Sequence, residues 1–115
     1  MSSAQIPEDR LTLYDNLIAR FSQFERKGKT TPYTSTNTYM FTFLAKDGSL
    51  ALRLSQEQQT EFKEKHNAQN MEQHGRVMKD FIAVPEELMS DIDLLEKYVE
   101  LSYQHTQGLT PKKKK

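Results

Sequence analysis

Two strand-like runs joined by Asp47-Gly48 constrain the fold of this chain most strongly. Thr38 to Lys46 is rich in Thr and aromatic residues, and Ser49 to Leu54 has Leu at every second position. Both patterns are typical of strands, and an Asp-Gly pair between two such runs is a strong signal for a tight hairpin turn. Because strands joined by so short a turn are antiparallel, a doubly wound parallel sheet is excluded.

Further helical and strand patterns flank this hairpin. A turn is expected at Ser35 to Asn37. The patterns predict helices over Pro7 to Phe24, Gln56 to His66 and Asp91 to Gln107, and further strands over Lys29 to Tyr33, Ala68 to His74 and Arg76 to Val84. The predicted fold class is therefore α+β. We expect a two-layer domain with element order α-β-β-β-α-β-β-α, in which helices cover one face of an antiparallel sheet of about five strands.

Length and composition limit the domain organisation. The chain has 115 residues and zero formal net charge, which fits one domain. We expect a single domain over residues 1–109 and a disordered Lys-rich tail over residues 110–115, because the tail follows Gly108 and has no apolar residue. The chain has no Cys, which excludes disulfides and thiol chemistry. No apolar run is long enough for a membrane span and no secretory signal is present, so a cytoplasmic protein is predicted.

The residues that commonly carry catalysis or bind metals show no recognised arrangement. The three histidines, His66, His74 and His105, do not form an HExxH motif. Glu72 and His74 fall on the same side of a predicted strand and could together touch a divalent ion, although a metal site needs three or four ligands. Exposed polar residues on an edge strand are the simpler interpretation. No nucleophile elbow or phosphate-binding Gly loop is present, so we predict no catalytic residue, no metal and no cofactor.

Basic residues gather at two places. Lys112, Lys113, Lys114 and Lys115 are candidate nucleic-acid contacts, with a solubilising end as the alternative. Arg26, Lys27 and Lys29 form a second, smaller cluster near Tyr33. Without the terminal lysines the body is acidic, which argues against a broad nucleic-acid footprint. Any binding by the tail should therefore be weak, indifferent to sequence and steeply dependent on salt.

The predicted sheet is apolar on both faces. Simple alternation places Tyr39, Phe41 and Phe43 on one face, and we expect this aromatic face to lie under the helices. The opposite, open face then becomes a candidate protein interface, with a homodimer as the simplest case and scattered surface hydrophobes as the alternative. The candidate interface residues are Met40, Thr42, Leu44, Ala51 and Arg53.

The order of several motifs resembles TfoX N-terminal domains. The run from Gly75 to Leu88 has a Gly, a Met-Lys pair, an aromatic residue and a Val before the last helix, as that family does. Upstream, Met40-Phe41, the Asp47-Gly48 turn and the run from Leu50 to Leu54 also fit. The resemblance covers Leu11 to Leu109, and it implies a two-layer α+β fold with an antiparallel sheet.

The sequence departs from that family in one loop. Many members have a Phe-Gly-Gly turn in the first hairpin, whereas this chain has Pro32 to Asn37 without Gly. The resemblance implies no catalytic residue, and it implies a link to the regulation of DNA-uptake genes only for longer proteins with a further helical domain. The leading hypothesis is a non-enzymatic interaction or regulatory module. The alternatives are a nucleic-acid-associated accessory protein that uses the Lys tail and, last, a small enzyme.

Overall fold

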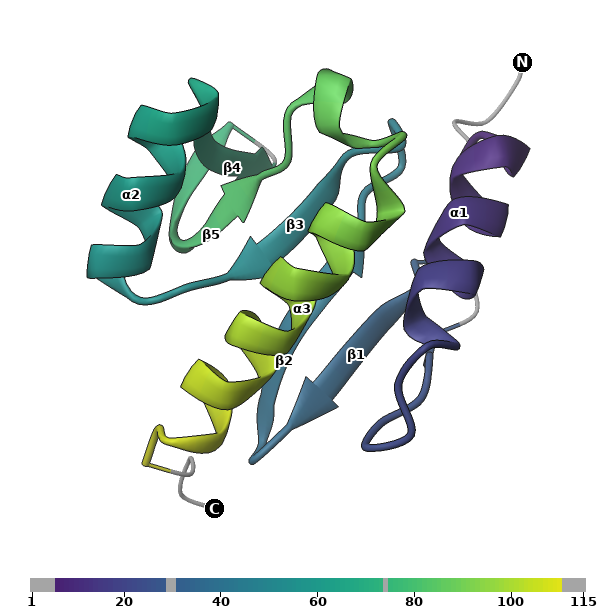
Figure 1. Cartoon of the computed structure of the whole chain (residues 1–115), viewed down its shortest axis with the longest axis horizontal. Helices are drawn as coiled ribbons and strands as arrows, with labels where there is room; N and C mark the ends of the chain where they lie inside the picture. The colour runs from purple at the N-terminus through teal and green to yellow at the C-terminus, as the bar shows by residue number, and fades with distance from the viewer. Residues whose placement is uncertain (1–5, 29–30, 74, 111–115) are drawn as a thin grey trace.

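The computed structural model describes residues 6–28, 31–73 and 75–110 (Figure 1). Its elements are, in chain order, α1 (Glu8–Ile18), β1 (Tyr33–Thr36), β2 (Tyr39–Leu44), β3 (Leu50–Arg53), α2 (Gln56–His66), β4 (Gln69–Gln73), β5 (Arg76–Ala83), a 3₁₀ turn η1 (Glu86–Leu88) and α3 (Ile92–Gln107). This order confirms the predicted α+β fold class and the predicted sequence of helices and strands.

The five strands form one sheet, in which every pair of neighbours is antiparallel. The spatial order is β1-β2-β3-β5-β4. The Asp47-Gly48 turn joins β2 to β3 as the sequence predicts. After β3 the chain runs through α2 and makes β4 at the sheet edge, and β5 then returns between β4 and β3.

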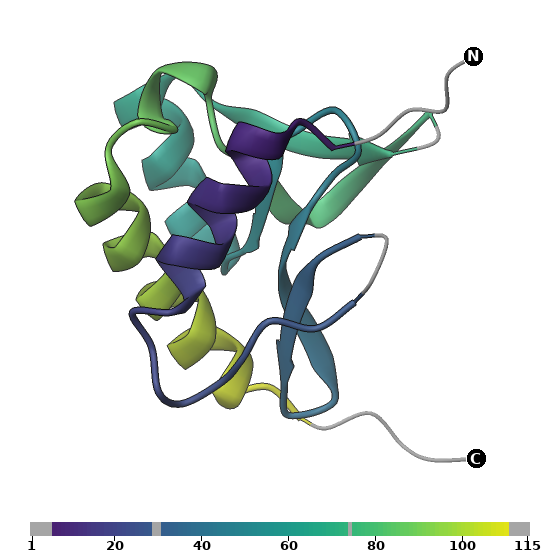
Figure 2. The ribbon, with the colours of Figure 1, turned by 90° about the vertical axis from the view of Figure 1, so that its right-hand side faces the viewer.

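The helices cover one side of the sheet. Figure 2 shows α1, α2 and α3 together on that side, with the sheet beyond them. The main core lies between these two layers. Its largest fully buried side chains include Tyr14, Phe41, Phe62, Leu44, Leu52 and Leu95. Burial of this apolar area is the main force that holds the helices on the sheet.

Helix α1 is shorter than predicted, because the chain leaves the helix after Ile18. Phe21 and Phe24, which the sequence placed on the helix, instead lie in the following loop and still pack on the core. Their rings stack with centroids 4.9 Å apart, and Phe24 also meets the Phe41 ring edge-on at 4.9 Å. The loop therefore buries the aromatic groups that a longer helix was expected to bury.

The first strand also differs from the prediction. Strand β1 begins at Tyr33 and continues through Thr36, where a turn was expected. Residues 29 and 30 of the predicted strand lie outside the described residues. The turn itself is one step later, at Asn37 and Thr38, whose φ angles are 54° and 69°. Two successive positive φ angles define the type I′ hairpin turn, whose twist matches that of the flanking strands.

Thr38 is an unfavourable residue for this turn, because a β-branched side chain is strained at positive φ. We expect Thr38→Gly to raise the free energy of unfolding by about 1 kcal/mol, since Gly has no Cβ to strain. Urea denaturation followed by circular dichroism measures the change. Thr38→Ala is the control, because it removes the branch but keeps a Cβ at positive φ, and its gain should be smaller. A loss of stability in Thr38→Gly would contradict the prediction.

A β-bulge in β2 decides which side chains face the helices. Thr34 pairs with Thr42, but the next residue of β1, Ser35, pairs with Met40. Phe41 is therefore the extra residue of a bulge, which interrupts the alternation of side chains along the strand. As a result Phe41 and Thr42 both face the helices, Phe43 faces the open side and Leu44 faces the helices again.

Candidate functional site

The bulge corrects part of the predicted protein interface. Leu44 is fully buried in the core under the helices, not on the open face. Thr42 is also under the helices, where its Oγ1 lies 2.7 Å from the Tyr14 hydroxyl and 2.6 Å from Thr34 Oγ1. Burial raises the pKa of Tyr14 well above its usual range. Neither Thr42 nor Leu44 is available to a partner.

The remaining predicted residues do lie on the open face. Met40 and Ala51 belong to its apolar side chains, and Arg53 stands beside them. Phe43, which simple alternation placed under the helices, is on this face too. We call the residues that pack together here the open-face cluster: buried Phe43, Ala45, Ala51, Met71 and Phe81, with partly buried Tyr33, Met40, Met78 and Ala83 around them.

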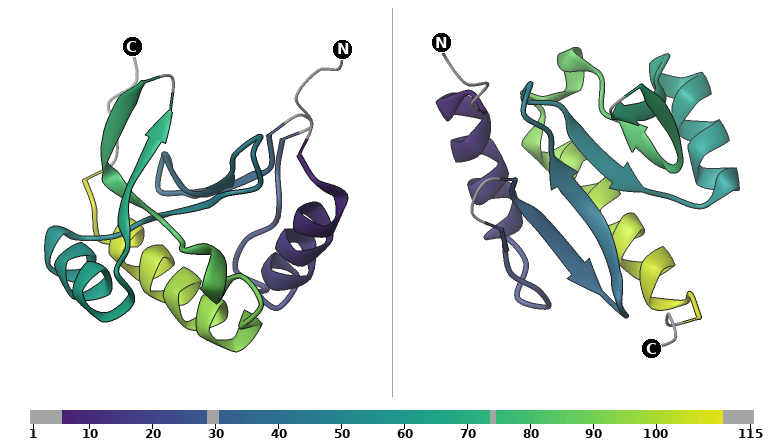
Figure 3. Two further views of the ribbon diagram at one scale, coloured as in Figure 1. Left: turned by 90° about the horizontal axis from the view of Figure 1, so that it is seen from above. Right: turned by 180° about the vertical axis from the view of Figure 1, so that it is seen from behind.

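The open-face cluster is buried within a single chain because the sheet curves. Seen from above in Figure 3, the green β4–β5 hairpin rises steeply from the blue strands, on the side away from the helices. The register of this hairpin shifts between Asn70 and Met71, where Lys79 to Phe81 of β5 have no partner in β4, and such irregularities increase the local bend and twist of a strand. The curvature brings Met71 and Phe81 towards Phe43, whose ring centroid is 5.2 Å from that of Phe81.

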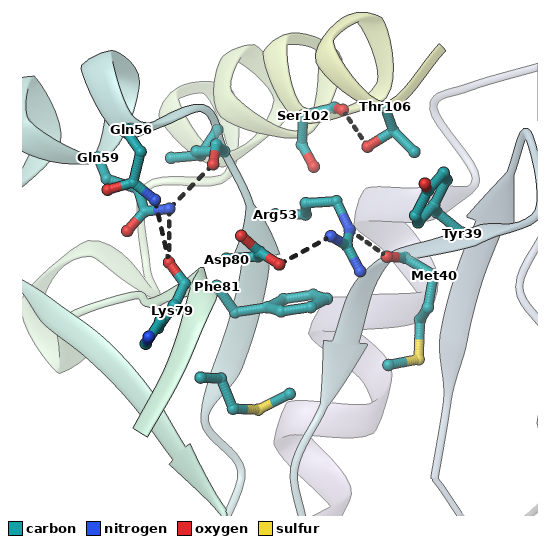
Figure 4. Close-up of polar contacts among 12 residues, drawn as sticks. Tyr39, Met40, Arg53, Gln56, Gln59, Lys79, Asp80, Phe81, Ser102 and Thr106 are labelled. Carbon is teal, nitrogen blue, oxygen red and sulfur yellow. Dashed lines mark hydrogen bonds and ion pairs between the residues drawn. The ribbon is translucent and has the colours of Figure 1, made fainter. Parts of the chain in front are cut away.

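Two side-chain amides hold the hairpin against α2. Gln59 lies in α2 and is almost fully buried, and its Nε2 donates to the carbonyls of Leu54 and Lys79, both at 2.9 Å. Asn70 Nδ2 donates to Gln59 Oε1 at 2.9 Å and to the Phe81 carbonyl at 3.0 Å. Figure 4 shows the contact of Gln59 with the Lys79 carbonyl. Because buried polar groups need partners, these bonds fix the position of the β4–β5 hairpin relative to α2.

A hollow of about 630 Å³ opens on the curved face. Its floor is apolar, and its charged groups are Lys46, Asp47 and Glu72. The full lining is Thr31, Tyr33, Met40, Phe43, Ala45, Lys46, Asp47, Met71 and Glu72. The volume falls in the range of sites for small ligands or inserted side chains. Two of its lining residues are Met, a side chain that adapts to partners of different shape.

Arg53 is held in place next to Met40, one of the residues that line this hollow (Figure 4). Its guanidinium carbon lies 4.7 Å from the Phe81 ring centroid and 5.1 Å from that of Tyr39. Its Nε donates to the Met40 carbonyl at 2.8 Å, and Nη1 makes a longer contact of 3.5 Å with Asp80. Partial burial lowers the pKa of Arg53. Burial and then the positive charge of Arg53 lower the pKa of His105 on α3.

Two arginines in and near the predicted basic cluster are paired with carboxylates. Arg26, from the predicted basic cluster, pairs with Asp15 at 3.1 Å, and Arg20 pairs with Asp93 and Glu96 at 2.8 and 2.6 Å. Lys29 and the candidate contacts Lys112 to Lys115 lie outside the described residues. Ion pairing of these arginines reduces the positive charge that they can offer to phosphates.

The described part of the chain offers no histidine-based metal site. His66 packs against Phe62 and Tyr98, with ring centroids 4.9 and 5.9 Å away. His74, the partner of Glu72 in the weak metal hypothesis, lies outside the described residues. Among the residues that are described, no three His, Cys, Asp or Glu side chains come together as a possible metal site.

No protein-family model matches this chain, and no curated protein matches it either. The resemblance to TfoX N-terminal domains therefore stays a prediction. In the described part of the chain, the helices are all too short or too polar to cross a membrane.

Proposed function

We propose that this chain is a small cytoplasmic interaction or regulatory module, without catalytic activity, of the bacterial TfoX N-terminal type. The observation that carries the proposal is the apolar hollow on the open face of the sheet. In this proposal the hollow takes up an apolar side chain of a protein partner. The resemblance in the order of motifs supports the family type, and the proposal that the module regulates rests on that resemblance alone.

The chemistry of the hollow suits binding better than catalysis. Tyr33, Met40, Phe43 and Met71 supply apolar contacts, and the hydroxyl of Tyr33 offers a polar end. The charged side chains Lys46, Asp47 and Glu72 are at its margin. The arrangement lacks a hydroxyl or thiol nucleophile beside a His base, which acyl transfer would require, among the residues that line it.

Burial of the open-face cluster within one chain leaves little flat apolar surface for a homodimer. A stable dimer buries about 800 Å² on each partner, which a flat apolar face supplies most easily. Here the open-face cluster is largely buried within one chain, and among the described residues Val77 is the exposed large apolar side chain, at 57%. We therefore propose insertion of a partner's side chain into the hollow, and a second copy of the chain is one possible donor of that side chain.

Met40→Glu tests this proposal. The variant places a carboxylate at the hollow, so a partner that binds wild-type protein should be lost, because its apolar side chain would meet a charge. Val77→Glu is the matched control, since it makes the same change at an exposed position that does not line the hollow. Quantitative affinity capture compares the three proteins, and sedimentation velocity detects a second copy as the partner. Equal capture by both variants would contradict the proposal.

A further inference from the structure

Arg53 differs from the other arginines that form ion pairs in the described part of the chain. Arg10, Arg20 and Arg26 each meet a carboxylate at the molecular surface. Arg53 has a side chain only 13% exposed, and its contact with Asp80, at 3.5 Å, is the longest ion pair among the described residues. Asp80 itself is 66% exposed. Of these four arginine side chains, the most buried one is therefore the one that lies farthest from its carboxylate partner.

The surroundings of Arg53 fix the direction of its guanidinium. The rings of Tyr39 and Phe81 lie within cation–π distance, and the Met40 carbonyl accepts from Nε. These contacts remove much of the side-chain entropy that an arginine otherwise loses on binding. The structure records no hydrogen bond from Nη2 to any described residue. The two Nη atoms are thus positioned, and Nη2 has no acceptor among the described residues.

Arg53 and the hollow share neighbouring residues. Met40 is common to both, because its carbonyl binds Arg53 and the residue lines the hollow. Phe81 stacks under Arg53 and packs on Phe43, another lining residue. A ligand with an apolar group in the hollow can therefore place an attached acidic group at Arg53.

From this arrangement we infer that the partner group is a peptide segment with a carboxylate next to an apolar residue: the apolar side chain fills the hollow and the carboxylate pairs with Arg53. This inference rests on the function proposed above and adds the chemistry of the partner. A guanidinium and a carboxylate match in charge and in planar geometry, and they bind through two parallel hydrogen bonds. Asp80, the present partner, is exposed and can give way.

A single negative charge fits this site better than a phosphate. Three carboxylates, those of Asp80, Asp47 and Glu72, stand against two cations, Arg53 and Lys46, around Arg53 and the hollow, so a doubly charged phosphate would add to an existing excess of negative charge. A peptide also suits the shape. The hollow opens on a sheet face, so the rest of a polypeptide can continue across the surface from a side chain held in it.

The test uses N-acetyl-Phe-Leu, with its free carboxylate, and the matching C-terminal amide as probes. Chemical shifts of the ¹⁵N-labelled full chain report each affinity. The acid should bind about tenfold more tightly than the amide or better, because charge-assisted bonds to Arg53 would be lost. Binding of the acid should also raise the pKa of His105, since it neutralises the nearby positive charge that now lowers it.

Two variants separate binding by Arg53 from a structural role. Arg53→Met keeps an unbranched side chain against the two rings but has no charge, so the acid should bind no better than the amide. Asp80→Asn removes the competing carboxylate, so the acid should bind several-fold more tightly than to wild-type protein. A role in folding alone would not strengthen binding in this second variant. Thermal unfolding of both variants confirms that each is folded.

Several binding results would overturn the inference. Equal affinity for acid and amide, with shifts around Met40 and Phe43, would overturn the anion site while leaving the hollow as a binding surface. Tighter binding of decanoate than of the peptide would assign the site to a free fatty acid, and tighter binding of octyl phosphate would assign it to a phosphate ester. Either result, or no binding of the acid at all, would overturn the inference, whereas the proposed function is tested separately by the capture experiment.

Discussion

Leu44→Glu should unfold the protein, whereas Met40→Glu, four residues earlier on the same strand, should leave it folded. The Leu44 side chain is fully buried under the helices, so the variant places a carboxylate where water cannot reach it. The expected cost is about 5 kcal/mol or more, which is comparable with the whole stability of a small domain. Met40 is only partly buried and faces the open side, so its new carboxylate can reach water.

Circular dichroism and urea denaturation of the two variants measure this difference. Simple alternation along β2 puts both residues on one open face and predicts that neither variant unfolds. The bulge at Phe41 puts them on opposite faces and predicts that only Leu44→Glu unfolds. A folded Leu44→Glu with stability near that of wild-type protein would therefore contradict the register of β1 and β2.

The features that the sequence predicts correctly depend on neighbouring residues. The turn at Asp47-Gly48, the helix around Phe62 and the order of all the elements follow from local patterns, and the structure confirms them. Ser55 also forms the capping box with Gln58 that its spacing indicates. These features depend on residues close together in the chain, which a single sequence displays directly.

The candidate site depends on features that no local pattern displays. A bulge adds one residue to a strand and reverses the face of everything beyond it, and nothing in Thr38 to Lys46 marks Phe41 as that residue. The hollow also needs Met71, from a strand that a helix separates from β3, and the register shift of the β4–β5 hairpin next to Met71. One signal was available: Gln59, a polar residue in line with Phe62 on the inner face of α2.

Gln59→Leu should destabilise the protein by about 3 kcal/mol and release the β4–β5 hairpin. The Gln59 amide donates to the Leu54 and Lys79 carbonyls and accepts from Asn70. Leucine fills a similar volume but makes none of these bonds, so the Leu54 carbonyl, in a residue 1% exposed, loses its side-chain donor. An unsatisfied buried group costs about 1–3 kcal/mol, and more than one group is affected here.

Two measurements test the Gln59→Leu variant. Urea denaturation measures the loss of stability, and amide hydrogen exchange at Met71 and Phe81 shows whether the hairpin opens before the rest of the sheet. Gln56→Leu is the matched control, because Gln56 lies on the exposed side of the same helix and reaches the Lys79 carbonyl only at 3.5 Å. Its cost should stay below about 0.5 kcal/mol. If the two variants lose the same stability, or if exchange at Met71 is unchanged in Gln59→Leu, the amides do not hold the hairpin. The curvature that forms the hollow must then come from the strand bulges alone.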